Sequence, residues 1–160
     1  MPKLQSIMER TLVILKPSAV ARGLIGEVLA RFERKGLQLV GLKMAQLSDE
    51  VLSRHYAHLA SKPFFGQIKA SMQATPVVLC CWQGKDAVQV VRNMTGSTNG
   101  CAAEVGTIRG DFSVSMQENI VHTSDSVENA AVEVSRFFLS EELFDYVHPF
   151  TQFIYASDER

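Results

Sequence analysis

The sequence Asn119-Ile120-Val121-His122-Thr123-Ser124-Asp125-Ser126 decides how the second half of the chain folds. A β-branched run leads to His122, and Asp125 followed by Glu128 has the spacing of a capping box, with Asp in place of Ser or Thr. We therefore expect a strand that ends at His122 and a helix that starts just after Asp125. An imidazole at such a junction is mostly neutral at pH 7, so one ring nitrogen keeps a lone pair.

Strands and amphipathic helices alternate on either side of this junction. Apolar, β-branched runs predict further strands over residues 11–15, 37–47 and 76–82. Helix signals begin at Ile25, Ser48, Pro63 and Asp86, and the helix after Asp125 should bury Val127, Ala130, Ala131, Val134, Phe137 and Phe138. Two βαβ halves with extra helices between them predict a ferredoxin-like α/β sandwich (βαββαβ) with a four-stranded antiparallel sheet.

Composition limits the kind of protein this is. At 160 residues we expect a single domain over 1–160. The formal net charge of −1 excludes a general binder of polyanions such as nucleic acid, so phosphate chemistry would need a local basic pocket. No apolar run is long enough for a membrane helix, and residues 1–10 lack the apolar core of a secretory signal. The odd cysteine count fits reduced thiols in the cytoplasm.

Phosphate binding would have to use side chains. There is no Walker loop, because Gly84-Lys85 is followed by Asp86, and there is no Gly-x-Gly-x-x-Gly segment. The candidates are Lys16 at a strand end, Arg92 beside the glycine-rich stretch 96–110, Thr98 within it, and Arg109 near its end. Arginine offers forked donors that match phosphate oxygens. Taken alone, each of these residues is also an ordinary solvated surface group.

Several other residues allow two interpretations. His55 and His58 lie three apart on a predicted helix, which is half of a metal site or, as we favour, a solvent-facing edge. Phe64 is most simply a core residue, but at a cleft it could stack on a nucleobase. The aromatic residues between 145 and 160 should pack on the body of the protein or on a neighbour.

These residues fall within longer segments that occur in a fixed order. The segments are Glu9-Arg10-Thr11-Leu12-Val13-Ile14-Leu15-Lys16-Pro17, Arg22-Gly23-Leu24-Ile25-Gly26-Glu27, His55-Tyr56, Lys62-Pro63-Phe64-Phe65, Gly106-Thr107-Ile108-Arg109-Gly110-Asp111-Phe112 and Asn119 to Ser126. With them the chain closely resembles the nucleoside diphosphate kinase family from about Glu9 to Tyr155. The pairing of the last two segments is highly specific.

The resemblance implies a role for each matching residue. It makes His122 the nucleophile that is phosphorylated on Nδ1, with Glu133 and Ser124 hydrogen-bonded around it. It places Lys16 and Asn119 on the ribose and its hydroxyl. It assigns phosphate binding to Tyr56, Arg92, Thr98 and Arg109. It assigns base stacking to Phe64, with Ile68 and Met116 lining the pocket. Family members use Mg²⁺ held by the nucleotide phosphates, so no metal ligand is expected in the protein.

The implied activity is transfer of the γ-phosphate of ATP or another nucleoside triphosphate to nucleoside diphosphates, through a phosphohistidine, by a homo-oligomer (tetramer or hexamer). The chain departs from the family pattern at Ser18-Ala19, where Asp-Gly is usual, at Gly100, where Pro is usual, and at Thr123, where Gly is usual. None of these changes removes a charged or nucleophilic group. A catalytically silent nucleotide-binding or scaffold module remains the rival; nucleic-acid binding is disfavoured because no basic stripe is visible.

Overall fold

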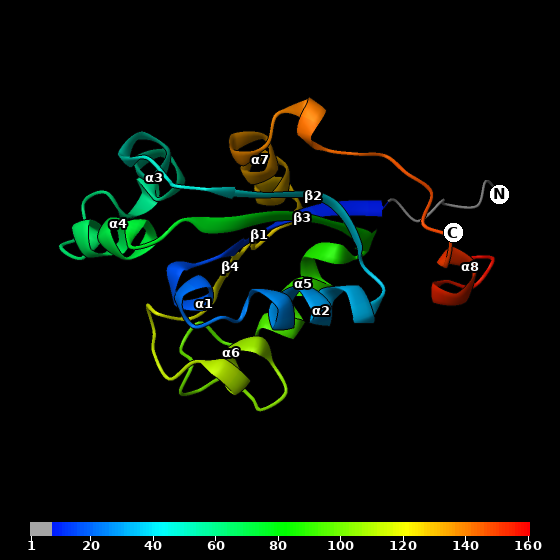
Figure 1. Cartoon of the computed structure of the whole chain (residues 1–160), viewed down its shortest axis with the longest axis horizontal. Helices are drawn as coiled ribbons and strands as arrows, with labels where there is room; N and C mark the ends of the chain where they lie inside the picture. The colour runs from blue at the N-terminus through cyan, green and yellow to red at the C-terminus, as the bar shows by residue number, and fades with distance from the viewer. Residues whose placement is uncertain (1–7) are drawn as a thin grey trace.

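A computed structural model describes residues 8–160 and shows one sheet between two layers of helices (Figure 1). The expectation that residues 1–10 carry no secretory signal therefore lies largely outside the described residues. The strands are β1 (Met8–Leu15), β2 (Gln38–Ala45), β3 (Val77–Lys85) and β4 (Val121–Thr123). They lie in the order β2-β3-β1-β4, and every neighbouring pair is antiparallel. The predicted ferredoxin-like fold is confirmed.

Helices cover both faces of this sheet (Figure 1). One layer contains α1 (Pro17–Ala21), α2 (Ile25–Lys35), α5 (Ala87–Thr95) and α6 (Ile108–Phe112). The other contains α3 (Asp49–His55), α4 (Phe65–Gln73) and α7 (Val127–Phe137), with the 3₁₀ turns η1 (Ala57–Leu59) and η2 (Ser140–Glu142). A short helix, α8 (Thr151–Ile154), follows near the C-terminus. No helix among residues 8–160 is long and apolar enough to cross a membrane.

Alternation along the strands produces two cores. Val13 and Leu15 of β1 belong to the core beneath α2 and α5, whereas Leu12 and Ile14 belong to the core beneath α3, α4 and α7. Successive side chains of a strand point to opposite faces. The adjacent Cys80 and Cys81 divide in the same way and are buried as free thiols.

Three predictions about helix ends and faces need correction. The cap of α7 is Ser126, whose hydroxyl accepts from Asn129 N at 3.1 Å, and not Asp125. Helix α4 begins at Phe65, two residues after Pro63. On α7, Val127 is half exposed and Ala131 is exposed, because only the Ala130–Val134–Phe137 stripe faces the sheet.

A strained turn precedes β4. Ile120 is fully buried and has φ of 75°, which is costly for a β-branched residue. Its peptide neighbours close a γ-turn, in which Val121 N donates to Asn119 O at 2.9 Å. The segment after β1 forms hydrogen bonds with both polar backbone groups of Ile120. Lys16 N donates to Ile120 O at 2.9 Å, and Ile120 N donates to the Ser18 hydroxyl at 3.1 Å. Ser18, a departure from the family pattern, thus supports the turn that leads into β4.

The C-terminal segment contacts the sheet edge. Phe144 N donates to Val40 O at 2.9 Å, and Lys85 N donates to the Tyr155 hydroxyl at 3.1 Å. Phe150 and Phe153 nevertheless remain largely exposed. Only part of the segment therefore packs on the body, and packing of the remaining aromatics on a neighbour stays a prediction.

Replacing Ser18 by Ala should weaken the turn before β4. The Ile120 N–H would lose its acceptor, and we expect the free energy of unfolding to fall by about 1 kcal/mol, measured by urea denaturation. Ser18→Asp, which keeps an oxygen acceptor at the same place, should retain most of that stability. Equal unfolding midpoints for the Ala variant and the parent would show that the Ser18 contact does not support the turn.

Candidate active site

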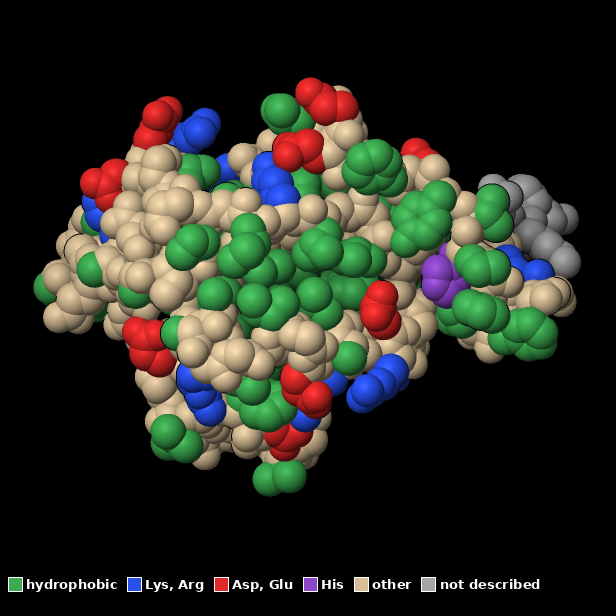
Figure 2. All heavy atoms as spheres, viewed as in Figure 1, with side chains coloured by type: hydrophobic (Ala, Val, Ile, Leu, Met, Phe, Trp, Pro, Cys, Tyr) green, Lys and Arg blue, Asp and Glu red, His purple; other side chains and the backbone are tan. Residues whose placement is uncertain are grey.

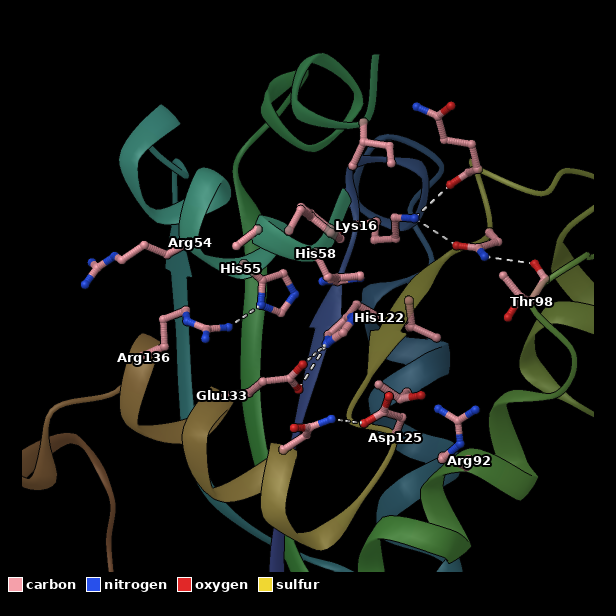
Figure 3. A pocket seen from close by; sticks show the side chains of 18 of the residues that line it. Lys16, Arg54, His55, His58, Arg92, Thr98, His122, Asp125, Glu133 and Arg136 are labelled. Carbon is pink, nitrogen blue, oxygen red and sulfur yellow. Dashed lines mark hydrogen bonds and ion pairs between the residues drawn. The ribbon is translucent and has the colours of Figure 1, made fainter. Parts of the chain in front are cut away.

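A cleft of about 980 Å³ opens beside β4, between the helices α3 and α4 on one side and the loops around residues 98 and 117 on the other. Eleven of the twelve predicted site residues line it: Lys16, Tyr56, Phe64, Ile68, Arg92, Thr98, Arg109, Met116, Asn119, His122 and Glu133. The twelfth, Ser124, is fully buried directly behind Glu133. Figure 3 shows the labelled members of this set converging on one space.

His122 reaches the cleft because of its register in the sheet. It lies opposite Ile14 of β1, and directly opposed residues of antiparallel strands point to the same face. Ile14 belongs to the core beneath α3 and α7, so the imidazole faces those two helices. Glu133 of α7 meets it there.

The Glu133 carboxylate fixes the imidazole. Its two oxygens lie 3.1 and 3.2 Å from His122 Nε2, and the Ser124 hydroxyl donates to one of them at 2.6 Å. Burial by itself would raise the pKa of the Glu133 carboxyl, but the hydrogen bond and charge of His122, together with Ser124, hold it well below its usual range. A carboxylate can only accept, so Nε2 carries a proton, and in the neutral ring the lone pair is then on Nδ1.

Lys16 and Arg109 occupy the buried end of the cleft. Lys16 Nζ donates to Asn119 Oδ1 at 2.9 Å and to Gln117 O at 2.8 Å. Burial first, and then the charge of Arg109, lower the pKa of Lys16 to about 8. The Arg109 guanidinium donates to the carbonyls of Gly96, Asn119 and Val121. Burial, followed by the charge of Arg92, lowers its pKa to about 10, so it remains a cation at neutral pH.

The cleft is cationic although the chain is not. Five Lys or Arg side chains line it, against the two carboxylates of Asp125 and Glu133. Arg92 and Thr98 are exposed, and among the described residues the Arg92 guanidinium has no hydrogen-bond partner. These groups are free to bind the oxygens of an anion.

The outer wall of the cleft is apolar. Phe64 is 42% exposed and Met116 59% exposed, and Ile68 on α4 is half-buried. The interpretation of Phe64 as a core residue is therefore wrong. Tyr56 lies deeper, and burial, helped by the charge of Glu133, raises its pKa to about 12. Its hydroxyl therefore stays protonated at neutral pH and can donate a hydrogen bond.

The structure adds residues that sequence reasoning missed. His55 is buried against His122, so its interpretation as part of a solvent-facing edge is wrong, whereas His58 is exposed as expected. Arg136 lies three residues after Glu133 on α7 and reaches the same cleft. That spacing puts both residues on one helix face, so the sequence could have indicated that Arg136 reaches the cleft once Glu133 was placed there.

The departures from the family pattern fit their surroundings. Ala19 has no positive φ, so a glycine is not needed there. Gly100 donates its N–H to Ser115 O at 3.0 Å, which proline could not do, and a Cβ at Gly100 would collide with the Ser113 hydroxyl. Thr123 is buried beside β1 and lines the cleft next to His122.

The donor set of the cleft does not form a cage for Mg²⁺, which prefers six oxygen ligands. Among residues 8–160 the cleft carboxylates are Asp125, which accepts from Asn129 at 2.6 Å, and Glu133, which is occupied by His122 and Ser124. A magnesium ion would therefore take most of its ligands from a bound substrate.

An α/β fold with a histidine fixed in a cationic, apolar-walled cleft defines a nucleotide-binding phosphotransferase. The family model for nucleoside diphosphate kinase matches residues 9–143. The chain is 59% identical to a nucleoside diphosphate kinase of Parabacteroides distasonis, covering 95% of this chain and 99% of that one. It is 49% identical to the Pyrococcus abyssi kinase, with 86% and 89% covered.

The solved structures that resemble this chain are also nucleoside diphosphate kinases. A nucleoside diphosphate kinase from Halobacterium salinarum in complex with CDP superposes with a TM-score of 0.91 at 37% identity, covering 93% of this chain and 99% of that one. One from Encephalitozoon cuniculi gives 0.86 at 44% identity, with 92% and 99% covered. The chain belongs to the nucleoside diphosphate kinase family, and it is an enzyme that transfers phosphate between nucleoside triphosphates and nucleoside diphosphates.

Nucleotide affinity should fall as Lys16 loses its proton. With a pKa of about 8, Lys16 is charged at pH 7 and mostly neutral at pH 9, so affinity for a nucleoside diphosphate should drop about tenfold between these values if binding requires the cation. Isothermal titration calorimetry at both pH values measures this drop. Lys16→Arg keeps its charge throughout and should flatten the profile; an equally steep profile for this variant would assign the effect to another group.

Proposed function

We propose that His122 carries the phosphate during transfer, through Nδ1. The observation that carries this proposal is the pair of contacts from Glu133 to Nε2 at 3.1 and 3.2 Å, because they direct the lone pair of Nδ1 away from α7. In this scheme the γ-phosphate of ATP or another nucleoside triphosphate moves to His122 and then to a nucleoside diphosphate, so both halves of the reaction use one cleft and maintain the triphosphate pools.

Each half-reaction is one displacement at phosphorus. The Nδ1 lone pair forms a bond to the γ-phosphorus while the bond from that phosphorus to the β-phosphate oxygen breaks, and the diphosphate leaves with the electron pair. The acceptor then reverses the step, since its terminal phosphate oxygen is already an anion and needs no base. The charge on the transferred group is spread over oxygens that fixed cations can stabilise.

We assign the remaining side chains by their place in the cleft. Arg92, Arg109, Thr98 and Tyr56 would bind the phosphates, and Lys16 with Asn119 would bind the ribose hydroxyl. Phe64 would stack on the base, with Ile68 and Met116 beside it. Glu133 and Ser124 hold the imidazole. Mg²⁺, held by the phosphates of the nucleotide, would neutralise part of their charge.

Stacking explains why one site can serve many nucleotides. The apolar wall at Phe64, Ile68 and Met116 offers a flat ring and no set of donors and acceptors for a base edge. Every base has a face that stacks on an aromatic ring. The CDP complex of the Halobacterium salinarum relative supports placing a nucleotide in this cleft.

We also propose a single domain over 1–160, a homo-oligomer and a cytoplasmic location, with no membrane or nucleic-acid partner. The two cores share one sheet, which supports the single domain. Hydrophobic side chains gather over β2 in Figure 2, and Leu42 and Met44 of that edge strand are at least half exposed. An exposed apolar edge of this kind favours self-association, as a tetramer or a hexamer. The three free thiols favour a reducing compartment.

Incubation with ATP labelled on the γ-phosphate should leave an acid-labile, alkali-stable label on the protein. His122→Ala should abolish the label, because it removes the Nδ1 lone pair that receives the phosphate in this scheme. His148→Ala, which changes a histidine outside the cleft, is the matched control and should label normally. Label retained in His122→Ala would refute the nucleophile assignment.

Turnover tests the same assignment by rate. Coupled turnover of ATP with a deoxynucleoside diphosphate should proceed in the parent and in His148→Ala, and should fall to background in His122→Ala. Turnover retained in His122→Ala would contradict the role proposed for His122.

A further inference from the structure

His55 is a buried, titratable side chain of the cleft, and the reaction described above gives it no role. It is the last residue of α3 and only 6% exposed. Its ring centre lies 4.5 Å from that of His122, and the two rings are inclined at 81°. Tyr56 and Phe137 pack on its other sides, also edge to face.

Arg136 determines which ring nitrogen of His55 carries the proton. Its Nη1 lies 3.0 Å from His55 Nδ1. A guanidinium has donors only, so Nδ1 must accept. Burial, followed by the charge of His122, holds the pKa of His55 well below its usual range, and the charges of Arg136 and His58 act in the same direction against Glu133. The ring is therefore neutral, and its proton lies on Nε2.

This Nε2–H has no hydrogen-bond partner among the described residues. Figure 3 shows the side of the His55 ring opposite the Arg136 contact turned toward His122. A buried donor without an acceptor is unfavourable, but an N–H directed at an aromatic ring recovers part of that loss. Perpendicular packing of two rings adds a preferred orientation.

A metal site is the rival interpretation of the same residues. His55, His122 and Glu133 each offer a ligand atom, and these atoms lie within 4.8 Å of one another. A ligating nitrogen needs a free lone pair, and the second nitrogen of a ligating histidine normally donates to an acceptor. Here Nε2 is protonated and Nδ1 faces a cation, so both nitrogens have the wrong polarity for a metal.

We propose that His55 is a positioning residue for phosphoryl transfer: Arg136 fixes its tautomer, and its Nε2–H and ring edge fix the plane of the His122 imidazole. This inference rests on the proposed role of His122. Glu133 holds only one corner of that ring, through Nε2. A second contact, across the ring plane, removes the remaining tilt and keeps Nδ1 in line with an incoming phosphorus.

Arg136→Met tests whether Arg136 fixes the tautomer of His55, since the substitution removes the hydrogen-bond donor to Nδ1 but keeps much of the side-chain volume. We expect the single-turnover rate of His122 phosphorylation at saturating ATP to fall about tenfold. Arg54→Met is the matched control, because it removes a positive charge from the same cleft, while among the described residues the hydrogen bond to His55 Nδ1 comes from Arg136 and not from the Arg54 side chain. Arg136→Lys, which still donates, should recover most of the rate. A charge effect would appear in KM, whereas loss of positioning appears in the rate at saturation.

Nitrogen-15 NMR of the imidazoles provides a readout that does not depend on activity. His55 should carry its proton on Nε2 in the parent and in Arg136→Lys, and should become a mixture of tautomers in Arg136→Met. A proton on Nδ1 in the parent, or equal phosphorylation rates in Arg136→Met and Arg54→Met, would overturn the proposal. If the parent forms no phosphohistidine, the proposed role of His122 fails instead, and the NMR result still reports separately on the tautomer.

Discussion

The contact between Glu133 and His122 is the interaction on which the rest of the site depends. An imidazole has two nitrogens, and whichever one is held as a donor leaves the other as a potential nucleophile. The buried carboxylate, itself fixed by the Ser124 hydroxyl, holds Nε2. Because Glu133 comes from α7 and His122 from β4, the packing of that helix on the sheet sets the direction of Nδ1. The chemistry therefore follows from how two adjacent elements meet.

The same junction concentrates positive charge in a chain whose formal net charge is −1. The turn at Ile120 is tied to the segment after β1, and this brings Lys16 within 2.9 Å of Asn119. Arg109 is anchored to the carbonyls on either side of that turn. Burying these cations costs free energy, and holding like charges together adds to that cost: burial first, and then a neighbouring arginine charge, lowers the pKa of both Lys16 and Arg109. A bound polyanion would relieve that cost, and this is the physical reason for the nucleotide affinity that we propose for this cleft.

The sequence predicted the fold, and it predicted most of the residues that the structure brings together in one cleft, because both depend on local signals. The continuous apolar run of β1 identifies a buried strand, the helical spacing in α2 identifies a buried helix face, and the motif around His122 identifies the cleft. The errors arose where tertiary packing decides between near-equivalent choices. Asp125 and Ser126 are both good caps by residue type, and in the structure Ser126 accepts the Asn129 N–H while Asp125 accepts from the Asn129 side chain. His55 looked solvent-facing because no pattern along the chain reveals that α3 ends against β4.

The attachment point of the phosphate on His122 tests the central claim most directly. The phosphorylated enzyme can be digested in alkali, and phosphorus NMR of the product distinguishes a phosphate on Nδ1 from one on Nε2. Since Glu133 occupies Nε2, the adduct should be on Nδ1. An adduct on Nε2 would mean that the imidazole ring flips during the reaction. The contact between Glu133 and His122 Nε2 would then not be the one that orients the reacting nitrogen.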